Sequence, residues 1–119
     1  MFGHQKIFHK PADVDIHNNL CFYYLSKKDN ESRRKAKNHY KIFKEIQLEL
    51  ENDIKKWHPL KIDTDVWAQW ELFKDKLTSD EKEKLISRLE LALKNSNLLE
   101  VKCKETIVEH LYKIENNIS

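Results

Sequence analysis

Apolar residues recur along most of this chain at alternating steps of four and three, the spacing of one face of an α-helix. The longest such stripe comprises Ala36, Tyr40, Phe43, Gln47, Leu50, Ile54 and Trp57. It predicts a helix over residues 31–57, with Ile46 widening the apolar face and Gln47 as the one polar member. Pro59 is expected to end this helix after His58, because proline disfavours helical backbone in the residue before it.

A shorter stripe of the same spacing follows Pro59. It comprises Val66, Trp70, Phe73 and Leu77, with Trp67 beside it. This stripe predicts a helix over residues 65–77. Asp63 and Asp65 stand at the predicted start, where a carboxylate interacts favourably with the helix dipole.

Capping boxes mark the starts of the last two predicted helices. The boxes are Thr78 with Glu81, for a helix over residues 79–94, and Asn97 with Glu100, for a helix over residues 98–117. The expected inward residues are Leu85, Ile86, Leu89, Ala92, Leu93, Val101, Ile107, Leu111, Ile114 and Ile118. Pairs of Glu and Lys four residues apart favour exposed helical faces. These pairs are Glu51/Lys55, Glu90/Lys94, Glu100/Lys104 and Glu109/Lys113.

The N-terminal segment carries a weaker pattern. Residues 1–11 show no clear period, so they predict an extended arm. A first helix is predicted over residues 13–27, with Asp13 as its N-cap. Its expected inward residues are Ile16, Leu20, Tyr23 and, as a further candidate, Tyr24. Val14 and Ile16 also alternate with acidic residues, which is typical of a strand.

Helix-breaking residues are almost absent, which supports the helical prediction. Gly3 is the only glycine, and Pro11 and Pro59 are the only prolines, among 119 residues. Tight hairpins and phosphate-binding loops use glycine for positive φ or for close backbone approach. The links between the predicted helices are short, so successive helices are expected to be antiparallel neighbours. The predicted fold is an all-α bundle of four to five helices, forming one domain over residues 1–119.

Charge and cysteine content narrow the class of protein further. Charged residues make up 35% of the chain, the formal net charge is +2 and the mean hydropathy is −0.79, so we expect a thin core. The apolar run over residues 20–25 is too short to span a bilayer, so no membrane partner is expected. Cys21 and Cys103 lie far apart and favour a reducing cytoplasm, with a long-range disulfide as the open alternative.

Basic residues are concentrated in residues 27–44. They are Lys27, Lys28, Arg33, Arg34, Lys35, Lys37, Lys41 and Lys44, opposed by Asp29 and Glu31. The following segment, residues 45–53, is purely acidic in its charges and holds Glu45, Glu49, Glu51 and Asp53. Two interpretations are open. The basic segment is either a patch that binds phosphates or an acidic protein surface, or a solvated face that keeps the protein soluble.

Arg34 and His39 have the spacing Arg-x4-His, and Arg33 stands one residue further from the same histidine. This pattern resembles the motif of the HEPN ribonucleases, small all-α dimers that cleave RNA across their dimer interface. The resemblance covers residues 33–39, and Lys35 and Lys37 depart from the family's pattern. It implies a metal-independent ribonuclease in which the imidazole acts as acid or base and the guanidinium holds the phosphate.

Other chemistry-bearing residues do not complete a site. His17 and Cys21 lie four apart, as two candidate ligands on one helical face, but a zinc site needs three or four ligands. No metal and no cofactor are therefore predicted. Trp57 and Trp70 are expected in the core, whereas Trp67 fits either a core position or an exposed interface anchor.

A binding module is favoured over an enzyme, because no nucleophile stands in a recognisable context and no nucleotide-binding loop is present. The leading hypothesis is a cytosolic adaptor or inhibitor that acts by protein–protein contact, as small charged helical proteins of phages and mobile elements often do. Its expected binding residues are Arg33, Arg34, Lys35, Lys37, Lys41, Lys44 and Trp67. The alternatives are nucleic-acid binding through residues 27–44 and the HEPN-like ribonuclease.

Self-association is a further expectation. Ile42 and Leu48 lie off the long stripe, and together with Trp67 they are candidates for an apolar partner patch. Gln47 either fixes the register of a partner helix or faces solvent without a role. We expect a C2 homodimer that brings residues 45–53 of one chain toward residues 33–44 of the other, and that salt weakens.

Overall fold

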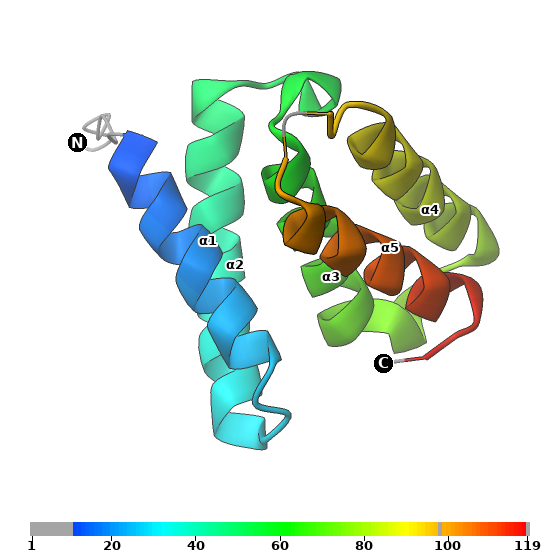
Figure 1. Cartoon of the computed structure of the whole chain (residues 1–119). Coiled ribbons are helices and arrows are strands. Elements are labelled where there is room, and N and C mark those ends of the chain that lie inside the picture. The colour runs from blue at the N-terminus through cyan, green and yellow to red at the C-terminus, as the bar shows by residue number, and fades with distance from the viewer. Residues whose placement is uncertain (1–10, 98, 119) are drawn as a thin grey trace.

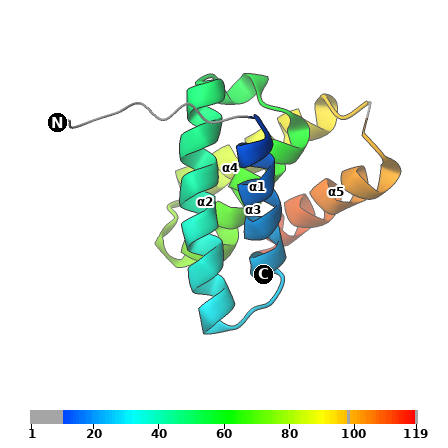
Figure 2. The same cartoon turned by 90° about the vertical axis from the view of Figure 1, so that its left-hand side faces the viewer.

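The N-terminal part of the chain forms two helices that lie side by side, as Figures 1 and 2 show. The computed structural model describes the chain except residues 1–10, 98 and 119, so residues 1–10 of the predicted arm lie outside the described part. Helix α1 spans Pro11–Leu25 and helix α2 spans Asn30–Leu50.

The C-terminal part is organised around α3, which spans Pro59–Phe73 and packs against each of the other four α-helices (Figure 1). The 3-10 turns Ile54–Lys56 and Lys74–Lys76 flank α3, and α4 and α5 follow over Ser79–Lys94 and Val101–Glu115. Every element within the described residues is helical, which confirms the predicted all-α bundle. No helix of the described part is long and apolar enough to cross a membrane.

The prediction of one helix over residues 31–57 is wrong at its C-terminal end. Helix α2 ends at Leu50, which is exposed, and Asp53 starts a separate 3-10 turn by accepting a hydrogen bond from the Lys55 amide at 3.1 Å. Pro59 begins α3 and does not end the preceding helix, which already stops at Leu50. Proline suits this first position because its missing N–H would have no helical partner there, and His58 caps the helix through its Nδ1.

The early start of α3 overturns the predicted boundaries of residues 65–77. Asp63 and Asp65, expected at an exposed helix start, are instead buried in the middle of the helix. Leu77 lies beyond the helix end at Phe73 and is half-buried. The acidic pair therefore makes internal contacts, described below, and does not interact with a helix N-terminus.

Helix α1 turns a different face inward from the one predicted. Its buried residues are Val14, Asn18, Cys21 and Leu25, again at steps of four and three. Ile16 and Tyr23, expected inside, are exposed. Asp13 is not the N-cap, because the helix already begins at Pro11. The buried stripe contains the polar Asn18, so the positions of the apolar residues alone indicated the wrong face.

Helix α4 follows its predicted boundaries, and its capping box is confirmed. The Glu81 amide donates to Thr78 Oγ1 at 3.1 Å, and the Thr78 amide donates to Glu81 Oε1 at 3.0 Å. The second predicted box is wrong, because α5 begins at Val101 with Glu100 as an N-cap that makes no side-chain bond. Val101 is exposed despite its predicted inward position.

Of the four predicted Glu–Lys pairs, the described residues form one, between Glu109 and Lys113 at 3.0 Å. Glu51 lies beyond the end of α2, so helical spacing does not join it to Lys55, and the other two pairs lie at the surface, where an ion pair contributes little. Ile118, expected inward, lies beyond the end of α5 and is exposed.

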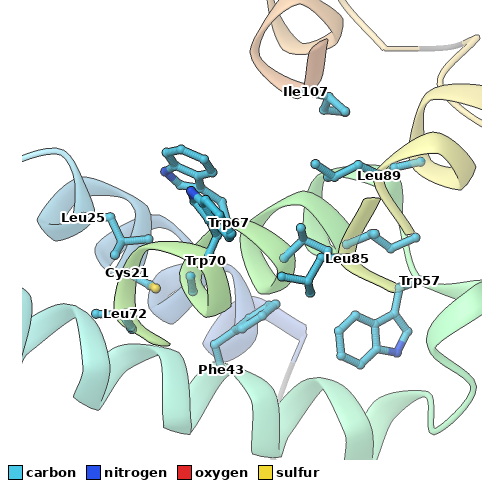
Figure 3. Close-up of a cluster of buried hydrophobic side chains, with 14 of the residues drawn as sticks. Cys21, Leu25, Phe43, Trp57, Trp67, Trp70, Leu72, Leu85, Leu89 and Ile107 are labelled. Atoms are coloured by element: carbon cyan, nitrogen blue, oxygen red, sulfur yellow. The ribbon is translucent and has the colours of Figure 1, made fainter. Parts of the chain in front are cut away.

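All five α-helices contribute to the core, and Figure 3 labels ten of its side chains, among them Cys21 and Leu25 of α1. Trp57 and Trp70 are buried, as predicted. Their indole N–H groups are satisfied by backbone carbonyls, since Trp57 Nε1 donates to Glu51 and Trp70 Nε1 donates to Ile118, each at 2.8 Å. These two bonds fasten the α2–α3 link and the C-terminal segment to the core.

Candidate functional site

Most of the basic residues of segment 27–44 are engaged within the protein. The ion pairs are Lys28 with Glu71, Arg34 with Glu31 and Lys44 with Asp65, and the ammonium groups of Lys27, Lys35 and Lys37 lie over the rings of Tyr23, Tyr24 and Phe73. Arg33 binds backbone carbonyls. Within the described part of the chain, Lys41 alone among the eight makes no such contact.

Arg33 has a structural task at the C-terminal end of α3. Its two terminal nitrogens donate to the carbonyl oxygens of Glu71 and Leu72, each at 2.7 Å. The last carbonyls of a helix have no partner within the helix, and a guanidinium satisfies them and interacts favourably with the helix dipole. The structure therefore places this predicted binding residue in a contact between α2 and α3.

Lys44 belongs to a buried network centred on Asp65, whose side chain is fully buried on α3. Lys44 Nζ lies 2.8 and 3.0 Å from the two carboxylate oxygens of Asp65, and the Tyr40 hydroxyl donates to Asp65 Oδ1 at 2.7 Å. A terminal guanidinium nitrogen of Arg88, on α4, lies 2.5 Å from Asp65 Oδ2. Burial alone would raise the pKa of Asp65, but Arg88, Lys44 and the hydrogen bonds outweigh it, so the pKa is lowered. The network joins α2, α3 and α4.

A hollow of about 630 Å³ lies along α2 beside the end of α3, and we call it the α2–α3 groove. Its apolar lining comes from Tyr40, Leu48 and Phe73, all half-buried. Its polar lining is supplied by Lys37, Asn38, Lys41, Lys44 and Glu45. The groove thus combines an apolar floor with a predominantly basic rim.

The surface of α2 that points away from the core carries a separate arrangement of charges. We call it the outer face of α2 and define it by six of the exposed residues of the helix, Arg34, Asn38, Lys41, Ile42, Glu45 and Glu49, while Asn30, Glu31, Arg33, Lys37 and Leu50 are exposed as well. Basic residues occupy its N-terminal half and acidic residues its C-terminal half. Asn38, Lys41 and Glu45 belong both to this face and to the lining of the α2–α3 groove.

Trp67 is not available as an interface anchor, and the patch predicted from Ile42, Leu48 and Trp67 is wrong. The Trp67 side chain is buried and stacks on His110, with ring centroids 4.0 Å apart and planes 6° from parallel. Gln47 is also buried within this chain's own core, so it neither faces solvent nor reaches a partner helix. Both residues serve internal packing.

The two residues of the HEPN-like pattern make separate contacts. Arg34 pairs with Glu31 at the surface, whereas His39 Nδ1 lies 3.0 Å from His17 Nδ1 on α1. His39 also stacks on the Tyr24 ring, with planes 8° from parallel. Burial, and next the neighbouring His17, lowers the pKa of His39. Within one chain, therefore, the imidazole and the guanidinium do not bind each other.

His17 and Cys21, the two candidate ligands on one helical face, lie in different environments. His17 faces His39, whereas Cys21 is completely buried, and burial followed by the charge of Asp65 raises the pKa of its thiol to about 12. A thiol that stays protonated is a poor metal ligand. Across the described residues, no three metal-binding side chains converge. Cys21 and Cys103 are both free thiols.

A cleft of about 520 Å³ between α1 and α5 was not foreseen from the sequence. Its lining includes Asn18, Ser26 and Asp63, and Asn18 Oδ1 is buried without a hydrogen-bond partner among the described residues. Asp63 accepts a 2.7 Å hydrogen bond from His110 Nδ1, a buried pair that ties α5 to α3. These residues come from three helices, so no local motif could have indicated the cleft.

Comparisons with protein families, curated proteins and solved structures found no match to this chain. The function proposed below therefore rests on the geometry of the site alone.

Proposed function

We propose that this protein is a protein–protein interaction module that binds an acidic segment of its partner along α2. The α2–α3 groove supports this proposal, because it places the apolar floor of Tyr40, Leu48 and Phe73 beside the ammonium groups of Lys37 and Lys41. An amphipathic segment with a bulky apolar residue flanked by carboxylates is complementary to such a surface.

The apolar floor supplies affinity, and the lysines supply orientation and selectivity. Burying one Leu or Phe side chain in the groove would contribute about 2 kcal/mol before the costs of ordering the segment. Lys41 is exposed and makes no ion pair within the described residues, and Lys37 makes a cation–π contact that a carboxylate can share. A partner therefore need not break a buried ion pair in order to bind.

The contacts that Arg33, Lys44 and Lys28 make within the chain favour an acidic protein, and not nucleic acid, as the partner. Affinity for nucleic acid comes mainly from several cations that each neutralise a phosphate. Here Arg33 and Lys44 are committed to contacts with α3, and Lys28 pairs with Glu71. The apolar floor of the groove has no role in binding phosphates, whereas it can bury an apolar side chain of a protein partner.

Selection from a displayed library of random peptides against the intact protein tests the proposal. We expect the selected peptides to combine Asp or Glu with Leu, Ile, Phe or Trp. Their affinity should fall about tenfold in the Lys37→Glu variant, because one attractive rim charge becomes repulsive. Lys102→Glu, at an exposed position of α5, is the matched control and should bind as the parent does.

The same variants distinguish the other outcomes. Selected peptides that bind Lys37→Glu as tightly as the parent would place the binding surface elsewhere and contradict the proposal. A single-stranded RNA that binds the parent more tightly than any peptide, and loses affinity in Lys37→Glu, would replace it with the nucleic-acid alternative.

A further inference from the structure

We infer that the chain also pairs with a second copy of itself, and that the two copies pack α2 against α2 in antiparallel orientation through their outer faces. The second copy meets the outer face of α2 and leaves the apolar floor of the α2–α3 groove open, so this pairing is additional to the proposed function. It also specifies the register in which the two helices meet.

The six positions of the outer face have the spacing common to a stripe on any α-helix, which is the same in both chain directions. Positions 34, 38, 41, 42, 45 and 49 are separated by steps of four, three, one, three and four, which read the same in both directions. A two-fold axis between positions 41 and 42 therefore pairs position 34 with 49, position 38 with 45, and position 41 with 42 of the second copy. A C2 interface allows this register, and the side chains at the paired positions decide whether it is favourable.

One of the three pairs of positions, 34 with 49, carries opposite charges. In the antiparallel register, Arg34 meets Glu49 of the second copy, and Asn38 meets Glu45 of the second copy. The axis repeats each contact, so each attraction occurs twice. A parallel arrangement would instead place Arg34 against Arg34 and Glu49 against Glu49, which is repulsive. The charge pattern thus selects one orientation.

The existing contacts of these residues do not oppose the arrangement. Arg34 already pairs with Glu31, but both side chains are 61% exposed, and an exposed ion pair of this kind contributes little to stability. Glu45 and Glu49 form no ion pair within the described residues. Arg34 can therefore keep Glu31 and add Glu49 of the second copy at small cost.

The centre of the face supplies its apolar contact. Ile42 is 38% exposed and lies next to the axis, where it meets the aliphatic stem of Lys41 of the second copy. The register also brings Ile42 of one copy toward Asn38, Lys41 and Glu45 of the other, which line the mouth of the α2–α3 groove. One isoleucine per chain is a small apolar contribution, so the dimer depends on its charges and is sensitive to salt.

Sedimentation equilibrium of the full chain, with two single variants and their mixture, tests this inference. Wild type should form dimers at low salt that dissociate at high salt. Arg34→Glu and Glu49→Arg should each be monomeric under the same conditions, with the dimer dissociation constant raised about tenfold or more, because each substitution turns two attractions into repulsions. Glu83→Arg, an exposed position of α4, is the control and should dimerise as wild type does.

The equimolar mixture of Arg34→Glu with Glu49→Arg carries the register-specific result. Every cross-chain pair between positions 34 and 49 is attractive again in the mixed dimer, so the mixture should dimerise although neither variant does alone. A substitution that merely unfolds the protein cannot be rescued in this way. A wild type that stays monomeric at low salt, or a mixture that stays monomeric, would overturn the inference. Acidic peptides that still bind through Lys37 would then leave the proposed function standing.

Discussion

Lys44 on α2 and Asp65 on α3 form an ion pair in the core, with the Lys44 ammonium 2.8 and 3.0 Å from the two carboxylate oxygens. Asp65 is fully buried, and Lys44 reaches it from a position that is only 26% exposed. A lysine that the sequence groups with a surface patch is therefore part of the scaffold that positions α2. The basic segment divides into residues that hold the helix in place and residues that remain on its surface.

Removing the charge of Asp65 should destabilise the protein strongly. Asp65→Asn leaves Lys44 and Arg88 without their shared counter-charge, and breaking a buried ion pair from one side typically costs about 3–5 kcal/mol. Chemical denaturation followed by circular dichroism measures the change in the free energy of unfolding. Asp75→Asn, at an exposed position, should stay within about 0.5 kcal/mol of the parent.

Asp65 should also account for part of the loss of folding stability in acid. The pKa of Asp65 is lower in the folded protein than the value of about 3.9 expected in the unfolded chain. The unfolded state therefore binds more protons, so the stabilisation is present above that value and is lost as pH falls through the folded-state pKa. Unfolding measured between pH 5 and pH 2 should show a smaller loss of stability in Asp65→Asn than in the parent; equal losses would contradict this.

The two thiols should differ in reactivity. Cys21 is completely buried with its pKa raised to about 12, mainly by burial, whereas Cys103 is half-buried on α5. Because the thiolate is the reactive form, a thiol reagent should modify Cys103 in the native protein and leave Cys21 intact. Mass spectrometry should find one modification in the parent and none in Cys103→Ser. Rapid labelling of Cys21 would show that α1 detaches readily from the core.

The contact between His17 and His39 predicts a second, milder pH effect. Burial, followed by the charge of His17, lowers the pKa of His39 below 6.5, so protonation is easier in the unfolded state. Stability should therefore fall as pH decreases below about 6.5 toward the folded-state pKa. Thermal unfolding of His39→Gln should change less than that of the parent between pH 7.5 and pH 5.5. An identical change in both proteins would remove His39 as the cause.

The fold was largely predictable because apolar spacing records helical faces. The steps of four and three identify α4 with its correct boundaries, and the Thr78 capping box fixes its start. The end of α2 was missed because the stripe continues through Ile54 and Trp57, which pack on the core from a 3-10 turn and a loop. Steps of four and three alone do not show whether the chain turns between two apolar residues.

The site was less predictable because its residues act through contacts between helices. The sequence located the basic segment, but it could not show that Arg33 binds the end of α3 or that Lys37 lies over Phe73. Those contacts join positions far apart in the chain. Acidic residues are common at helix starts, so Asp63 and Asp65 indicated one. Because α3 already begins at Pro59, they lie in the core instead.

The HEPN-like alternative makes its own prediction. Because His39 contacts His17 and Arg34 pairs with Glu31, we expect the purified protein not to cleave RNA in the absence of added metal. Incubation with a labelled single-stranded RNA, followed by gel electrophoresis, provides the measurement. Cleavage by the parent that disappears in His39→Ala would establish the ribonuclease and require a dimer different from the one inferred above.

The most direct test of the role of α2 is a two-dimensional NMR spectrum of the ¹⁵N-labelled protein, recorded at low salt from micromolar to millimolar concentration. Concentration-dependent shifts of the backbone amides should be confined to residues 34–49 and the adjoining Phe73, and high salt should abolish them. Shifts centred on the cleft between α1 and α5, or a spectrum that does not change with concentration, would contradict the assignment of the outer face of α2 as the partner-binding surface.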